Sequence, residues 1–338
     1  MARTAFCNRR QFLQGSLALA GVSLLSGCGL LPSRSQQGAR IPRIGFLGSG
    51  SAESFNREPF VQGMRDPGWV EGQTVAIEWR FAEATPEALP ALAAELVRLP
   101  VDIVVTSGTP ATLAVKTATG TIPIVQAVGA GDLVQEGVVA SLAHPGGNVT
   151  GLTAISVELT AKRLDLLKQT IPGLRRVAVL WNPTFVSAAS AFGETQAAAQ
   201  ALGIRLQSLE VRSPDELESL LAAATGQQAD ALILLTDSIT VVHGARIARR
   251  AATSRLPSIF DRRAYAVEGG LIGYGPDFLD MPRRAATYVD KILKGARPAD
   301  LPVERPARFD FVINLQTARD IGLTIPQEVL MQATEVVQ

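Results

Sequence analysis

The chain carries the stretch Arg43-Ile44-Gly45-Phe46-Leu47 and carries it again, little altered, as Arg176-Val177-Ala178-Val179-Leu180. Each copy is a short apolar run behind an arginine, which is typical of a parallel strand covered on both faces. Other pairs recur at similar spacings, namely residues 101–105 with 229–233, residues 122–125 with 256–259, and Gly151 with Gly273. Four matched segments predict two lobes of the same fold.

Strand and helix patterns alternate within each copy. In the first copy the apolar runs at residues 44–47, 75–79, 103–105 and 122–125 predict strands. Between them, residues 89–99 have apolar positions at helical spacing. Thr109-Pro110 offers an N-cap and a first-turn proline for a helix over residues 111–119. This alternation predicts the α/β class, with each lobe a doubly wound, Rossmann-like sheet.

The length of 338 residues fits about two domains. A helical pattern at residues 283–293 and an apolar run at residues 309–313 follow both copies. These two elements need partners in the sheets already formed. We therefore expect the chain to pass back across the lobes near its C-terminus.

The N-terminus predicts an export signal over residues 1–28. Three arginines are its only charges, and the apolar or small run at residues 15–27 is too short to span a bilayer. Asn8-Arg9-Arg10-Gln11-Phe12-Leu13-Gln14 resembles a twin-arginine export signal. Residues 29–41, rich in Pro, Ser, Gln and Gly, predict a flexible tether.

Leu25-Ser26-Gly27-Cys28 resembles a bacterial lipobox. On this interpretation Cys28 is lipidated and becomes the mature N-terminus, which anchors the protein to the membrane outside the cytoplasm, on the periplasmic side. The alternative is a cleaved secretory signal in which Cys28 is incidental.

Composition excludes several functions. A net charge of +1 with no basic tract argues against nucleic-acid binding. Two Cys and two His leave little material for a disulfide framework or a metal site, so we expect neither a metal nor a cofactor.

The stretch Gly48-Ser49-Gly50-Ser51-Ala52-Glu53 begins like a dinucleotide-binding fingerprint. Glu53 occupies the third glycine position, and Pro59 delays the following helix, so the tight turn on a helix N-terminus is missing. An exported, dehydrogenase-like enzyme is therefore a weaker alternative, and we expect no catalytic residues.

Candidate ligand-binding residues follow the predicted strands, because ligands of open α/β sheets bind beyond the C-terminal strand ends. Small polar residues stand in matched loops of the two copies, and an acid and a tyrosine stand in neighbouring turns. An ordinary role as helix cap or turn residue is the alternative for each. The candidates are Ser49, Ser51, Thr109, Asp132, Asn182, Asp237 and Tyr274.

Several motifs resemble the ABC transporter substrate-binding protein family, whose better understood members bind tryptophan or tyrosine. The resemblance spans nearly all of residues 42–335. The motifs are Glu71-Gly72-Gln73, residues 89–97, Gly108-Thr109-Pro110-Ala111, residues 144–152, Val179-Leu180-Trp181-Asn182-Pro183, Gly269-Gly270-Leu271, Tyr274-Gly275-Pro276 and residues 284–293. One departure is Gly131-Asp132-Leu133, where members of the family often have Gly-Asp-Pro.

The resemblance implies a type I periplasmic-binding-protein fold with a hinge of three crossovers. The N-terminal lobe would comprise residues 42–154 and 277–300, and the C-terminal lobe residues 155–276 and 301–338. The implied function is capture of a small organic solute, amino acids included, by domain closure, for delivery to an ABC permease and its ATPase. A receptor of the same fold that signals to a membrane kinase is the alternative.

Overall fold

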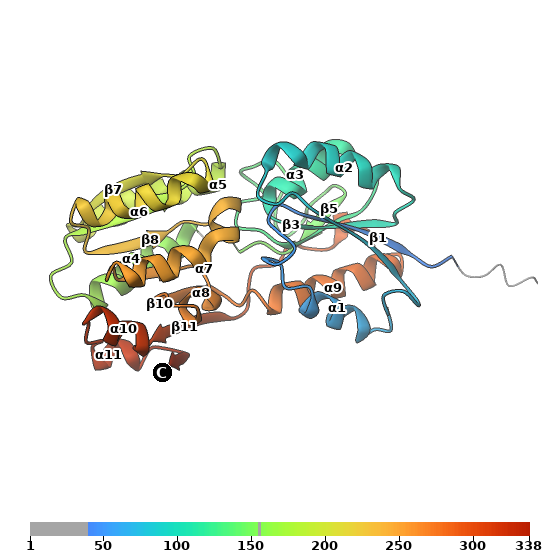
Figure 1. The fold of residues 1–338 in the computed structure, drawn as a ribbon. Coiled ribbons are helices and arrows are strands. Elements are labelled where there is room, and N and C mark those ends of the chain that lie inside the picture. The colour runs from blue at the N-terminus through green and yellow to red at the C-terminus, as the bar shows by residue number, and fades with distance from the viewer. Residues whose placement is uncertain (1–39, 155–156) are drawn as a thin grey trace, which may run out of the picture. The chain divides into compact units, whose positions relative to one another are not determined.

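The computed structural model describes residues 40–154 and 157–338, of which residues 41–338 form one compact unit. Figure 1 shows two groups of strands, each with helices on both sides. The export signal, the lipidation of Cys28 and most of the predicted tether lie outside the described residues.

The first sheet has five parallel strands in the order β2-β1-β3-β4-β5. The strands are β1 (Arg43–Gly48), β2 (Ala76–Phe81), β3 (Ile103–Ser107), β4 (Ile124–Val128) and β5 (Val149–Gly151). All four strand predictions in this copy are confirmed, with boundaries that differ by a few residues. We call this sheet and the helices packed on it the first lobe.

Alternate residues of the first sheet enter two separate cores. Ile44 and Phe46 face α1 (Glu58–Arg65) and α9 (Asp280–Leu293), whereas Leu47 faces the other layer. That other layer contains α2 (Leu89–Arg98) and α3 (Thr109–Ala118). Parallel strands covered on both faces explain the nearly continuous apolar runs.

Helix α9 follows the second copy in sequence but packs on the first sheet. Its buried Met281, Ala285, Tyr288 and Ile292 recur every three or four residues, which makes one apolar face. That face meets α1 and the first sheet (Figure 1). The expected return of the chain is confirmed for this helix.

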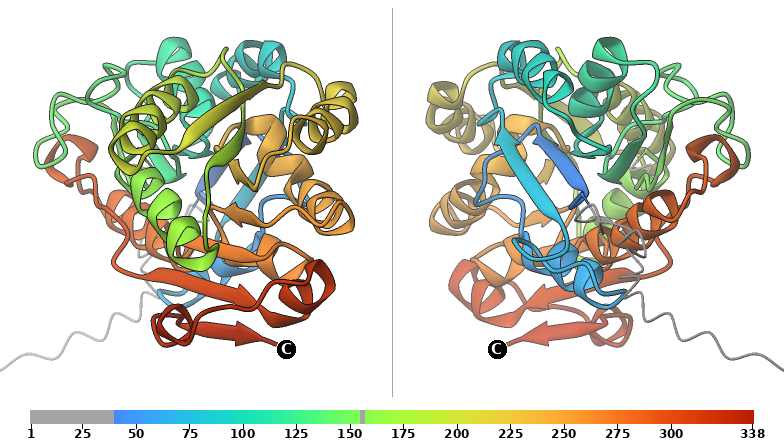
Figure 2. Two further views of the ribbon diagram at one scale, coloured as in Figure 1. Left: turned by 90° about the vertical axis from the view of Figure 1, so that its left-hand side faces the viewer. Right: turned by 90° about the vertical axis from the view of Figure 1, so that its right-hand side faces the viewer.

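The second sheet has seven strands in the order β12-β11-β10-β9-β8-β6-β7, and only the pair β10–β11 is antiparallel. Figure 2 shows β11 and β12 at one edge of it. The strands are β6 (Arg176–Trp181), β7 (Arg205–Glu210), β8 (Ala231–Leu234), β9 (Ser258–Phe260), β10 (Ile272–Pro276), β11 (Phe309–Asn314) and β12 (Glu335–Val337).

Helices cover both faces of this sheet. The sheet and these helices form the second lobe. One core involves α4 (Val157–Thr170), α5 (Val186–Leu202), α10 (Leu315–Ile321) and α11 (Gln327–Leu330). The opposite core involves α6 (Leu217–Gly226), α7 (Ser238–Thr253) and α8 (Arg263–Val267). The predicted α/β fold with two doubly wound lobes is confirmed.

The chain passes from the first sheet to the second after β5, returns after β10, and leaves again after the 3-10 turn Pro298–Asp300. Two of these passages pair, because Thr153 N donates to Glu304 O at 3.0 Å. The residue limits given above for each lobe stay predictions.

Candidate functional site

A cavity of about 520 Å³ lies where strands of both sheets end. Gly48, Ser107 and Val128 close strands of the first sheet there, and Thr236 and Arg262 follow strands of the second. Backbone amides and polar side chains converge at such edges, which makes them the usual ligand sites of α/β proteins.

Three predicted residues of the first lobe line this cavity: Ser49, Ser51 and Thr109. Ser49 Oγ donates to Ser107 O at 3.2 Å, and Ser51 Oγ accepts from Ser54 N at 3.1 Å. Thr109 Oγ1 accepts from Gly131 N at 3.2 Å. All three hydroxyl oxygens therefore already take part in hydrogen bonds, that of Ser51 within its own loop and those of Ser49 and Thr109 to the segments that end β3 and follow β4.

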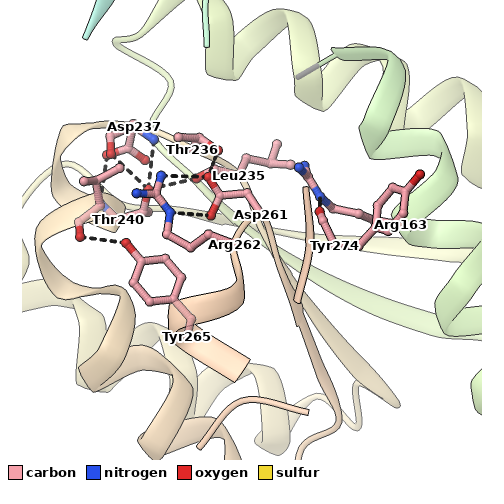
Figure 3. A network of polar contacts seen from close by, with 10 residues as sticks. Arg163, Leu235, Thr236, Asp237, Thr240, Asp261, Arg262, Tyr265 and Tyr274 are labelled. Carbon is pink, nitrogen blue, oxygen red and sulfur yellow. Dashed lines mark hydrogen bonds and ion pairs between the residues drawn. The ribbon is translucent and has the colours of Figure 1, made fainter. Parts of the chain in front are cut away.

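Asp237 lines the cavity from the second lobe and caps α7. Its Oδ1 accepts from Ile239 N at 2.7 Å and from Thr240 N at 3.1 Å, as Figure 3 shows in part. Its Oδ2 is buried and has no hydrogen-bond partner among the described residues. Burial raises the pKa of Asp237 to about 6, although the capping bonds oppose this shift. The capping alternative holds for one oxygen and leaves the other free.

Beside Asp237 lies a charge cluster of buried Arg163, buried Asp261 and partly buried Arg262 (Figure 3). Arg262 Nε and Nη2 donate to the two carboxylate oxygens of Asp261 at 3.1 and 2.9 Å. Burial acts to raise the pKa of Asp261, but the attraction of Arg262 and Arg163 holds it below its ordinary value. Thr236 Oγ1 also donates to Asp261 Oδ2, at 2.8 Å.

Aromatic side chains supply the apolar part of the lining. They come from both lobes and from the passage after β10, and they are Phe55, Phe81, Phe185, Tyr265 and Phe278. Phe81 stacks on Trp79, with ring planes 4° apart and centroids 6.3 Å apart. A planar apolar group would find aromatic faces on several sides of this cavity.

Asp132, Asn182 and Tyr274 do not belong to the lining. Asp132 Oδ1 accepts from Val134 N at 2.9 Å within a turn, and Asn182 Oδ1 accepts from Thr184 N at 3.0 Å. Tyr274 packs its ring edge-on against Phe311, with centroids 5.8 Å apart, next to the second-lobe core that involves α4 and α5. Each makes the local contacts of the structural alternative, and a role in ligand binding stays a prediction for all seven candidates.

Sequence reasoning missed Arg262. The rule that selected Asp237, a polar residue directly after a strand, applies equally to Asp261-Arg262 after β9. The aromatic lining gave no comparable signal, because a phenylalanine in a sequence does not reveal whether its ring faces a core or a cavity.

A family model described as ABC transporter substrate binding protein matches residues 47–337. The chain belongs to this family. The match covers both lobes, so the two sheets and the cavity between their strand ends are parts of one substrate-binding protein.

Known proteins are similar to this substrate-binding protein over most of its length. A tyrosine-binding protein of Clostridioides difficile is 23% identical over 313 residues, which is 90% of this chain and 89% of the relative. A crystal structure from Vibrio cholerae, of a conserved domain protein, has a TM-score of 0.82 at 26% identity and covers 88% of this chain and all of its own. A structure from Streptococcus pneumoniae, an ABC domain in complex with L-Trp, has a TM-score of 0.78 at 26% identity, with 88% and 99% covered.

Residues 40–154 and 157–338 of the substrate-binding protein lack two features. No group of three or more His, Cys, Asp or Glu side chains is placed to hold a metal ion. Nor does this part contain a helix with the length and apolarity that a bilayer crossing needs.

Proposed function

We propose that this protein is an extracytoplasmic lipoprotein that binds an aromatic amino acid and delivers it to an ABC importer. The observation that carries the proposal is the unpartnered Oδ2 of Asp237 in an aromatic-lined cavity. A buried carboxylate oxygen without a donor costs free energy until a cation or an N–H group reaches it. An ammonium group supplies both.

The size and lining of the cavity favour an amino acid with a ring. A cavity of about 520 Å³ lies within the range of sites for small organic ligands. Phe55 and Phe81 of the first lobe and Tyr265 of the second offer apolar faces for an aromatic side chain. The relatives named above, one tyrosine-binding and one with bound L-Trp, support this ligand class.

Binding would work by domain closure. Residues of both lobes line the cavity, so a ligand that contacts both stabilises the arrangement in which the lobes are together. No covalent chemistry is required. The importer's permease would recognise the ligand-bound arrangement, and its ATPase would drive transport.

Isothermal titration calorimetry on residues 41–338 tests the ligand class. We expect L-Trp, L-Tyr or L-Phe to bind, and L-Glu and glucose not to bind. Asp237→Asn keeps the α7 cap but removes the free carboxylate oxygen, so it should weaken binding by at least about 30-fold. Binding of none of the aromatic amino acids, or unchanged affinity in Asp237→Asn, contradicts the proposal.

The membrane anchor is tested separately in the full chain. We expect the wild-type protein to partition into the membrane fraction through a lipid on Cys28, and Cys28→Ser to lose the lipid. Mass spectrometry of the mature N-terminus reads this directly. An unlipidated N-terminus in the wild type would leave a cleaved secretory signal as the interpretation.

A further inference from the structure

The polar groups of the cavity differ in how fully they are already bonded. In the first lobe, Ser49 Oγ donates to the end of β3, whereas Ser51 Oγ accepts within its own loop and Thr109 Oγ1 accepts from the loop after β4. Pro110, the second residue of α3, has no N–H to offer. In the second lobe, by contrast, Asp237 Oδ2 has no hydrogen-bond partner among the described residues.

Arg262 is a second incompletely bonded group of that lobe. Its Nε and Nη2 bind Asp261, while its Nη1 has no hydrogen bond to any described residue. The side chain lines the cavity and is 15% exposed. Its Cζ lies 4.2 Å from the ring centroid of Phe278 and 5.2 Å from that of Tyr265. Ion pairing and aromatic contacts therefore fix this guanidinium in place before any ligand arrives.

Arg262 and Asp237 belong to adjacent parallel strand ends, because β8 pairs with β9. Thr236, next to Asp237, donates to the same Asp261 Oδ2 that accepts from Arg262 Nη2 (Figure 3). No ion pair within 4.0 Å joins Arg262 and Asp237 in the described structure. Asp237 and Arg262 thus line one cavity without forming an ion pair with each other.

We infer that Arg262 binds the ligand's carboxylate through Nη1 while Asp237 binds its ammonium group, so that the second lobe recognises the zwitterionic head of an α-amino acid. This inference rests on the proposed function and adds its specificity-determining residue. Arginine is well suited to carboxylate recognition because its donors lie in one plane. A zwitterion adds no net charge, so both contacts form without burying an uncompensated ion.

The rival subsite for the carboxylate is the first-lobe loop at the N-terminus of α3, which contains Thr109. The two sites predict different responses to removal of the carboxylate from the ligand. If Arg262 contacts the carboxylate, an Arg262 substitution weakens the binding only of ligands that carry this group. If the α3 loop contacts the carboxylate, an Arg262 substitution changes the affinity equally for ligands with and without this group.

The experiment compares L-tryptophan with tryptamine, which lacks the carboxylate, and indole-3-propionate, which lacks the ammonium group. Each is titrated calorimetrically to millimolar concentration, with displacement of a bound ligand for weak complexes. Arg262→Gln should weaken the binding of L-tryptophan and indole-3-propionate by about 30-fold. It should leave the affinity for tryptamine within about threefold of wild type. Asp237→Asn should weaken L-tryptophan and tryptamine but spare indole-3-propionate.

Two further variants keep the test independent of folding. Arg262→Lys retains a positive charge beside buried Asp261, and it should show the same carboxylate-dependent loss in smaller degree. Arg246→Gln removes one charge from the exposed face of α7, where Arg246 pairs with Glu218, and should change none of the three affinities.

Failures of the two proposals are distinguishable. Suppose the wild-type protein binds L-tryptophan, but Arg262→Gln weakens the binding of L-tryptophan and of tryptamine equally, or changes neither affinity. The inference is then overturned and the proposed function stands. If the wild type binds no aromatic amino acid, the proposed function fails and the inference falls with it.

Discussion

Arg163 Nε donates a 2.8 Å hydrogen bond to the backbone oxygen of Tyr274, which ties α4 to the middle of β10. Helix α4 follows the first passage between the lobes, and β10 precedes the second. Arg163 is 1% exposed, and its Nη2 has no partner among the described residues. Burial lowers the pKa of this guanidinium, and nearby Asp261 opposes the shift. A buried cation thus holds together the two segments beside the passages.

We expect Arg163→Ala to lower the free energy of unfolding by about 2–4 kcal/mol, because it leaves a void and an unpaired Tyr274 oxygen. Urea denaturation of residues 41–338 measures the change. Lys162→Ala is the control, since Lys162 is 41% exposed and pairs with Asp165 on the surface. A loss below about 1 kcal/mol in Arg163→Ala would show that the bond to Tyr274 contributes little.

Asp237 should make the ligand-free protein more stable on acidification. Its pKa in the folded state is about 6, against an ordinary value of 3.8. The free-energy cost of burying the ionised carboxylate is therefore present in full above pH 6. As pH falls from 7.5 to 5, the folded protein takes up the proton and about half of this cost is relieved.

Thermal and urea unfolding of wild type and Asp237→Asn measure this contribution. The difference between the two should shrink by about 1–1.5 kcal/mol between pH 7.5 and pH 5, with the variant more stable at pH 7.5. Glu136, whose pKa burial and Asp132 raise to about 6, titrates in both proteins and cancels. A difference that does not change with pH would contradict the assignment.

Ligand binding should release protons near pH 6. An ammonium group beside Asp237 favours the ionised carboxylate, so binding lowers a pKa of about 6 and expels the proton. Calorimetry at pH 6 in buffers of different ionisation enthalpy should show release of about half a proton, and much less at pH 8. Proton uptake on binding at pH 6 is the opposite sign and would argue against contact with Asp237.

The fold could be predicted well from the sequence, because the apolar pattern that marks each strand or helix lies within a short stretch of residues. Apolar runs such as residues 103–105 must be buried on both faces, and only a covered parallel strand does that. β7 (Arg205–Glu210) was not predicted, since it is a polar edge strand with one buried residue, Leu209. The residue pattern alone left the destination of α9 open, because an amphipathic helix shows that it has a buried face but not which sheet covers it; only the family resemblance assigned this segment to the N-terminal lobe.

The site was predicted less completely. Position after a strand placed Ser49, Thr109 and Asp237 at the cavity, because strand ends of one sheet share an edge. Sequence could not show that Asn182, after β6, binds Thr184 instead of facing the cavity. Nor could it show that Arg262 keeps one nitrogen free, because that depends on Asp261 and Phe278 in three dimensions.

Gly48 should control the aromatic wall of the cavity. It lies opposite Phe81 in the register of β1 and β2, and a Cβ at Gly48 would come 2.6 Å from Phe81 Cδ1. The ring has little freedom to give way, because Trp79 stacks on it and the Cζ of Arg57 lies 5.1 Å from its centroid. Gly48→Ala therefore displaces a ring that lines the cavity.

We expect Gly48→Ala to weaken aromatic ligands by about 10-fold and to cost about 1–3 kcal/mol of stability, as overpacking does elsewhere. Gly120→Ala is the matched control, because its added Cβ meets nothing within 4 Å. Calorimetry and urea unfolding of both variants separate the two effects. If Gly48→Ala loses stability but binds aromatic amino acids as tightly as wild type, the Phe81 ring is not part of the ligand contact, and the aromatic selectivity must come from the other rings of the lining, Phe55, Phe185, Tyr265 and Phe278.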